Sequence, residues 1–126
     1  MNKLKLSQYE TAFLNAIIRN HPAWAEYLTD QIQNLEVVSR EYTGGGSYVD
    51  FYVDADKVLK RFENIPHFFD VDVVAPDASD AAVFMLYTQL TDDGKTKVLH
   101  FLEIAIAGTR YDEAEVYSWL ISRDTH

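Results

Sequence analysis

The feature that most constrains the fold is a change of hydrophobic period near residue 35. Before it, apolar residues recur every three or four positions, the spacing of a helix with one buried stripe. After it they alternate, and β-branched and aromatic residues become frequent, as is typical of strands. The pattern predicts an α+β fold, with two N-terminal helices packed on a mostly antiparallel sheet of about five strands. We expect one domain over residues 1–126.

Capping signals set the expected bounds of the helices. Ser7 followed by Glu10 has the spacing of a capping box, which predicts a helix start. Pro22 keeps the residue before it out of the helical region, so this helix should end there. A second, shorter helix should then run from Pro22 to about Gln31.

Five segments have the composition of strands. We expect them at residues 35–42, 47–54, 68–75, 82–90 and 97–107. The glycines at 44–46 fit a hairpin turn or bulge that needs a positive φ. The last two segments, joined through Asp93-Gly94, should form the central pair. Because both of their faces are largely apolar, we expect cover on both sides, with Leu99 on the face of Phe101.

Two further segments are expected to be helical. Residues 56–64 carry apolar side chains at helical spacing and should form one or two turns before Pro66. Asp112 and Glu115 can open a short C-terminal helix whose apolar contacts would be Val116, Leu120 and Ile121. A last strand over residues 116–120 is the alternative.

Composition removes several classes of function. Without cysteine there is no disulfide, no thiolate nucleophile and no Cys-ligated zinc. No stretch approaches about 18 apolar residues, so we expect a soluble, cytoplasmic protein with no membrane contact. The formal charge of -9 repels nucleic-acid phosphates and favours a cationic partner. The histidines lack ligand spacing and no calcium loop is present, so we expect no cofactor, no metal and no catalytic residue.

The charge is concentrated in one segment. Residues 50–93 carry ten acids and three bases, a net -7. Alternation places one set of polar residues of the second and third strands on the face opposite their apolar side chains. If the two strands adjoin, they form an acidic, tyrosine-bearing face for a partner, made of Tyr48, Asp50, Tyr52, Asp54, Asp70 and Asp72. A merely solvated face is the alternative.

One motif carries a resemblance. The segment at residues 39–51, with its Thr43-Gly44-Gly45-Gly46 turn, and the later Leu102-Glu103 pair resemble a pattern of small uncharacterised bacterial proteins. The chain departs from that pattern at residues 104–106, where glycine and an aromatic residue are expected. Small, acidic, cysteine-free domains of this kind resemble immunity proteins, which neutralise a toxin by covering its active site. The resemblance implies no catalytic residues.

These observations favour a non-enzymatic binding protein, of immunity type, that covers a basic toxin such as a nuclease. In that reading the aspartates steer association and pair with the toxin's lysines and arginines. Two alternatives stay open. The first is a small-molecule-binding or enzymatic domain with a pocket between helices and sheet, using Glu103 or His100. The second is a homo-oligomer that self-associates through the tyrosine-bearing face or a strand edge.

Overall fold

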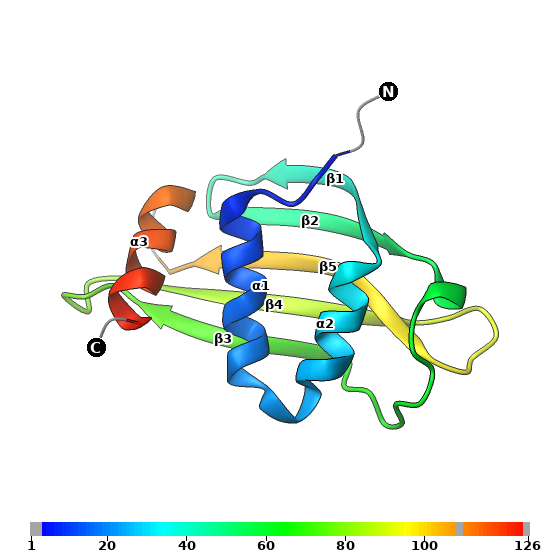
Figure 1. Ribbon diagram of the computed structural model, residues 1–126. Coiled ribbons are helices and arrows are strands. Elements are labelled where there is room, and N and C mark those ends of the chain that lie inside the picture. The colour runs from blue at the N-terminus through cyan, green and yellow to red at the C-terminus, as the bar shows by residue number, and fades with distance from the viewer. Residues whose placement is uncertain (1–3, 108–109, 125–126) are drawn as a thin grey trace.

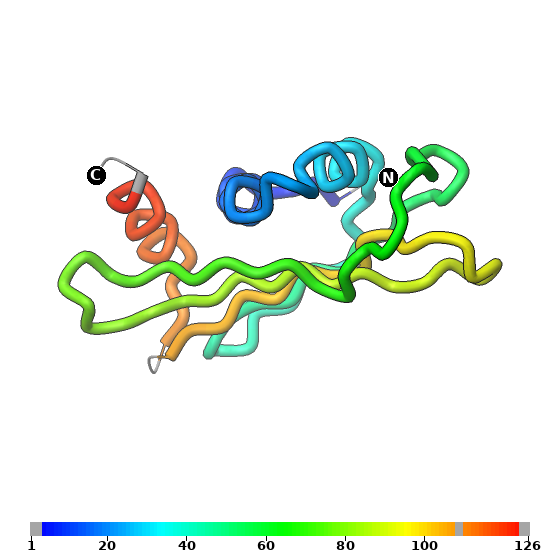
Figure 2. Tube along the Cα trace, turned by 90° about the horizontal axis from the view of Figure 1, so that it is seen from below, coloured from blue at the N-terminus to red at the C-terminus, as the bar shows by residue number. Residues whose placement is uncertain are grey.

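The computed structural model describes residues 4–107 and 110–124 and has three α-helices on one face of a five-stranded antiparallel sheet (Figures 1 and 2). The predicted α+β class is therefore confirmed. The elements are α1 (Gln8–Asn20), α2 (Ala25–Gln33), β1 (Leu35–Tyr42), β2 (Gly46–Val53), β3 (Phe68–Val74), β4 (Ala81–Leu90), β5 (Lys97–Ile106) and α3 (Glu113–Asp124), with 3₁₀ turns at Pro22–Trp24 and Ala55–Lys57. No helix within the described ranges combines the length and apolar surface needed to cross a bilayer.

Local signals position the helices as expected. The Ser7 hydroxyl accepts from the Glu10 backbone N–H at 3.1 Å, and the Glu10 carboxylate accepts from the Ser7 backbone N–H at 2.8 Å. This reciprocal capping box starts α1. The helix ends at Asn20, directly before His21 and Pro22. The proline then opens the 3₁₀ turn that leads into α2. The helix pair is thus determined mainly by its termini.

The strand order is β1-β2-β5-β4-β3, and every neighbouring pair is antiparallel. Hairpins join β1 to β2, β3 to β4 and β4 to β5, but β5 inserts between β2 and β4. In the first turn Gly44 has a φ of +82°, as the glycine pattern predicted. The order separates β2 from β3 by two strands. The two strands that carry the predicted aspartates therefore do not adjoin.

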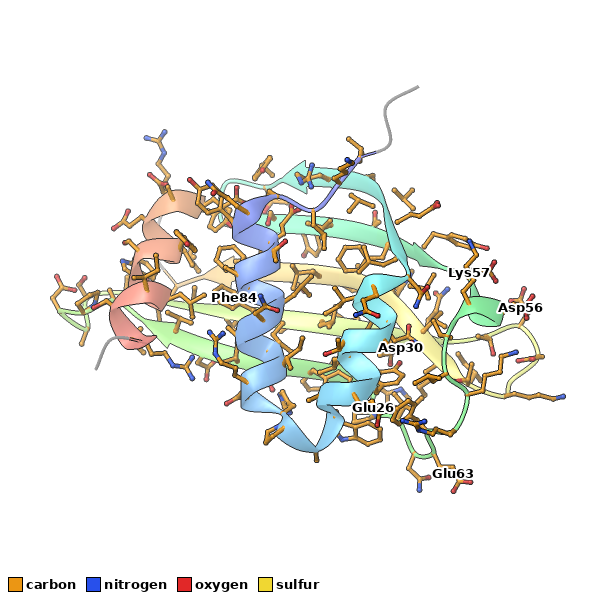
Figure 3. The ribbon with its side chains drawn as sticks, viewed as in Figure 1. Glu26, Asp30, Asp56, Lys57, Glu63 and Phe84 are labelled. Atoms are coloured by element: carbon orange, nitrogen blue, oxygen red, sulfur yellow. The ribbon has the colours of Figure 1, made fainter. Side chains whose placement is uncertain are left out.

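The core lies between the sheet and the helices. Phe13 of α1 stacks on Phe84 of β4 with ring centroids 4.4 Å apart, and both side chains are fully buried. Figure 3 labels Phe84. Tyr27 of α2 contacts Phe69 of β3, and its hydroxyl donates to the Lys97 carbonyl at 2.8 Å. Aromatic side chains of both N-terminal helices therefore cover this face of the sheet.

The helix expected at residues 56–64 is wrong beyond the single 3₁₀ turn at Ala55–Lys57. The backbone N–H of Leu59 donates to the Asp30 carboxylate of α2 at 2.8 Å instead of to a local carbonyl. Val58 and Ile65 are buried, so the segment is held by tertiary contacts. The apolar residues of this segment have helical spacing, but tertiary contacts hold its backbone in a non-helical conformation.

The C-terminal helix is confirmed, and the alternative strand over residues 116–120 is wrong. Asp112 accepts from the Glu115 backbone N–H at 3.2 Å, which caps α3. Val116 and Leu120 are buried as expected. Ile121, also expected in the core, is 45% exposed, and Trp119 is buried instead.

Cover on both sides of the central strands is also wrong, because all three helices lie on one face (Figure 2). The pairing shifts at His100, where Tyr87 faces Phe101 but Thr88 faces Leu99. This bulge turns Leu99 to the helix-covered side, where it is buried, and not to the face of Phe101. Its backbone N–H donates to the side chain of Gln31, which is buried in α2, at 3.1 Å.

Candidate functional site

The open face is the face of the sheet opposite the helices (Figure 2). Burial alternates along the strands, so the residues between the buried ones project onto it. Strand pairing aligns its central residues in two lines that cross the sheet from β2 to β3. The first line contains Asp50, Phe101, Tyr87 and Phe68, and the second contains Tyr48, Glu103, Met85 and Asp70.

Four aromatic rings cross the open face from β2 to β3, and we name them the aromatic row: Tyr48, Phe101, Tyr87 and Phe68. Successive centroids lie 6.3, 4.4 and 5.9 Å apart, and the Tyr87 and Phe101 planes differ by only 19°. Tyr48 is 38% and Phe68 50% exposed. Tyr87 and Phe101 between them are partly buried. A row of accessible rings on a water-facing sheet is typical of a binding surface.

Two carboxylates lie beside the β2 end of this row. Asp50 is paired with Phe101 across the strands, and Glu103 follows Phe101 by two residues on β5. Asp50 accepts from the Ser39 hydroxyl at 2.7 Å, and Glu103 accepts from the Tyr48 hydroxyl at 3.0 Å. The hydrogen bond to Glu103 raises the pKa of the Tyr48 phenol. Both carboxylates are thus oriented by neutral donors, which leave their charge uncompensated.

The acids of β3 have different surroundings. The Asp70 carboxylate lies 3.8 Å from His21 Nε2, and its backbone carbonyl accepts from the Asn20 side chain at 2.9 Å. The Asp72 carbonyl lies 3.4 Å from the Arg123 guanidinium of α3. The ends of two helices therefore occupy the outer edge of β3, which reduces its availability to an added strand.

Asp54, which alternation predicts on the face of Asp50 and Tyr52, lies beyond the end of β2 in the structure. It follows the last residue of β2, and its carboxylate accepts from the Asp56 backbone N–H at 2.9 Å, which caps the 3₁₀ turn. It lines a cleft of about 380 Å³ at this end of the sheet, together with Tyr52 of β2 and with Asp92 and Asp93 of the β4–β5 hairpin. The 3₁₀ turn that starts directly after β2 is the reason for this difference.

The other five predicted residues project onto the open face in two groups. Tyr48, Asp50 and Tyr52 come from β2, and Asp70 and Asp72 come from β3, with β5 and β4 between them. The expectation of one plate on adjoining strands is wrong, because strand order depends on long-range pairing. The intervening positions hold Phe101, Tyr87, Met85 and Glu103.

Sequence reasoning did not assign these intervening residues to the site. Their signal was present, since the last two strands are apolar on both faces. An apolar pattern on both faces predicts double cover, and the structure shows that here it marks an accessible aromatic surface. Glu103 lies between the buried Leu102 and Ile104 on β5 and accepts from Tyr48 of the open face, so its side chain does not line a pocket between helices and sheet. Within the described ranges, no group of three or more His, Asp or Glu side chains is placed to hold a metal ion.

The chain matches no family model, and no curated protein or solved structure is significantly similar to it. The resemblance to small bacterial immunity proteins stays a prediction.

Proposed function

We propose that this protein is a non-enzymatic binding protein that covers a basic surface of a partner protein with its open face. The observation that carries the proposal is the aromatic row on the open face, exposed at both ends, with uncompensated carboxylates beside it. Aromatic rings on a rigid sheet supply contact area at little entropic cost. The fold does not require them to be there, because they lie outside the helix-covered core.

The charge distribution supports a basic partner. Residues 50–93 carry -7 of the total -9, and both strands with predicted site residues bear part of it. Such a field steers a cationic protein toward the face and can raise association to about 10⁸ M⁻¹s⁻¹ at low salt. The specific form that we propose is a cytoplasmic immunity-type inhibitor of a basic toxin, such as a nuclease, whose phosphate-binding lysines and arginines would face Asp50 and Asp70.

Charge reversal tests the proposal. The candidate partner is the basic C-terminal domain of a large secreted protein encoded next to this gene, and association is followed by surface plasmon resonance at two salt concentrations. We expect Asp50→Lys and Asp70→Lys each to slow association about tenfold at low salt, with a smaller effect at high salt. The matched control is Asp56→Lys, a 90% exposed residue of the turn after β2 (Figure 3).

Equal slowing by all three substitutions would show that only bulk charge matters. Unchanged association for Asp50→Lys and Asp70→Lys would show that the partner binds elsewhere. Self-association of the open face brings like charges together across a two-fold axis, so we expect a concentration-independent monomer in light scattering.

A further inference from the structure

The Phe101 ring lies near the β2 end of the aromatic row, beside two carboxylates. The Phe101 ring stacks on Tyr87 on its β4 side, with centroids 4.4 Å apart. Its other ring neighbours are His100, which lies edge-on at 5.1 Å, and Tyr48 of β2, which is 6.3 Å away and tilted by 50°, so no second stacked ring covers Phe101. Asp50 is its cross-strand partner and Glu103 lies two residues along β5. One side of the ring is therefore bordered by two carboxylates and a phenol.

The two carboxylates are fixed in direction but not neutralised. Ser39 and Tyr48 each donate to one carboxylate oxygen, at 2.7 and 3.0 Å. In the described part of the chain, no lysine, arginine or histidine forms an ion pair with Asp50 or Glu103. By contrast, Asp70 already has His21 beside it. The strongest uncompensated negative charge on the aromatic row is therefore at its β2 end.

A guanidinium group fits these surroundings better than an ammonium group. Its plane stacks on an aromatic ring, and its N–H donors can reach carboxylates on two sides at once. An ammonium is a compact, strongly hydrated charge that gains less from a ring face. We propose that Tyr48, Phe101, Asp50 and Glu103 form a binding site for one arginine side chain of the partner protein. The naming of a protein partner rests on the function proposed above; the arginine preference rests on the geometry.

The test uses two small peptides, acetyl-Gly-Arg-Gly-amide and acetyl-Gly-Lys-Gly-amide, titrated into the intact protein and followed by NMR. We expect weak, millimolar binding of the arginine peptide, with shifts centred on the Phe101 and Tyr48 rings and the Glu103 side chain. The lysine peptide should bind at least fivefold more weakly. Equal affinities, or shifts centred on β3, would overturn the assignment.

Variants identify the groups responsible. Glu103→Gln keeps an acceptor for Tyr48 but removes the charge, and we expect it to weaken the arginine peptide at least fivefold. Phe101→Leu should do the same by removing the ring. Asp72→Asn removes an equal charge from the same face at β3 and should change affinity less than twofold. If Phe101→Leu does not fold, the comparison of arginine-peptide affinity between Glu103→Gln and Asp72→Asn tests the site by itself.

The result is separable from that of the function test, because the peptide titration needs no cognate partner. Arginine preference without binding of the basic toxin domain would retain this site and reject the toxin proposal. Toxin binding that depends on Asp50 and Asp70, but no preference for arginine over lysine, would retain the proposed function and reject this inference.

Discussion

The two faces of the same sheet contain similar residue types in opposite circumstances. On the helix-covered face, Phe84 is fully buried and stacks on Phe13 of α1. On the open face, Phe68 is 50% exposed, and its ring contacts the Tyr87 ring of the same face. Aromatic content therefore does not reveal which face forms the core. The difference lies in which rings receive a partner from the helices, and the unpartnered rings mark the surface available for binding.

The strongest test of this comparison is truncation of one ring on each face. We expect Phe84→Ala to lower the free energy of unfolding by about 3–5 kcal/mol, because it leaves a cavity beneath α1. Phe68→Ala removes a half-exposed ring and should cost about 1 kcal/mol or less. Urea unfolding of both variants measures the difference. Equal costs would mean that something covers the open face in the folded protein.

Charged groups show the same contrast. Glu10 is 1% exposed, and its two carboxylate oxygens accept from the Arg40 guanidinium at 2.6 Å each. Asp50 on the open face accepts instead from a neutral group, the Ser39 hydroxyl. Burial of a carboxylate in this fold thus comes with a bidentate cation, whereas exposure leaves the carboxylate free for a partner's cation.

Neutralising each acid should therefore have unequal effects. We expect Glu10→Gln to cost about 2–3 kcal/mol, because it leaves Arg40 without its bidentate partner. Burial and the charge of Glu10 raise the pKa of nearby Glu113, so loss of Glu10 makes Glu113 easier to ionise and keeps the cost below that of a fully isolated cation. Asp50→Asn should stay within about 0.5 kcal/mol of the parent protein.

A double variant separates the charge effect from packing. Glu10→Gln with Arg40→Met removes both charges and should recover part of the loss seen in Glu10→Gln. If Glu10→Gln unfolds in urea like the parent protein, the buried ion pair does not contribute to stability, and the contrast between the faces would rest on the aromatic residues alone.

The sequence predicted those parts of the fold that depend on neighbouring residues. The Ser7 capping box, the break at Pro22 and the positive φ at Gly44 are local, and the structure contains all three. The strand order β1-β2-β5-β4-β3 depends on pairing between distant segments, for which no local pattern exists. The tertiary hydrogen bond at Leu59 and the bulge at His100 were unpredictable for the same reason.

The candidate site was predicted in part. Alternation correctly places Asp50 and Asp70 on one face, because residue parity within a strand is local. Alternation does not show that β5 and β4 lie between them, so it predicts a doubly covered core around Phe101 and Tyr87. The side of the sheet that the helices leave open is a tertiary property. The rings and carboxylates can be recognised as one surface only when it is known which side of the sheet the helices cover.

The smallest effect we expect concerns one buried phenol. Burial, with a smaller contribution from Asp30, raises the pKa of Tyr27 well above its ordinary value, and its hydroxyl donates to the Lys97 carbonyl. The folded state thus holds this proton more tightly than the unfolded state. The resulting stability is fully present below about pH 10 and is lost as pH rises toward the folded pKa, at about 1.4 kcal/mol per pH unit.

Tyr27→Phe removes this titration. At neutral pH it should cost about 1 kcal/mol, because the Lys97 carbonyl loses its donor. Above pH 10 the parent protein loses stability faster than the variant, so the difference between them should shrink and then reverse. Tyr52→Phe, which removes a 56% exposed phenol from the open face, is the control and should follow the parent curve. Parallel urea-unfolding curves for Tyr27→Phe and the parent protein between pH 8 and pH 11 would contradict the proton linkage, and would mean that the phenol beneath the helices is as accessible to alkali as one on the open face.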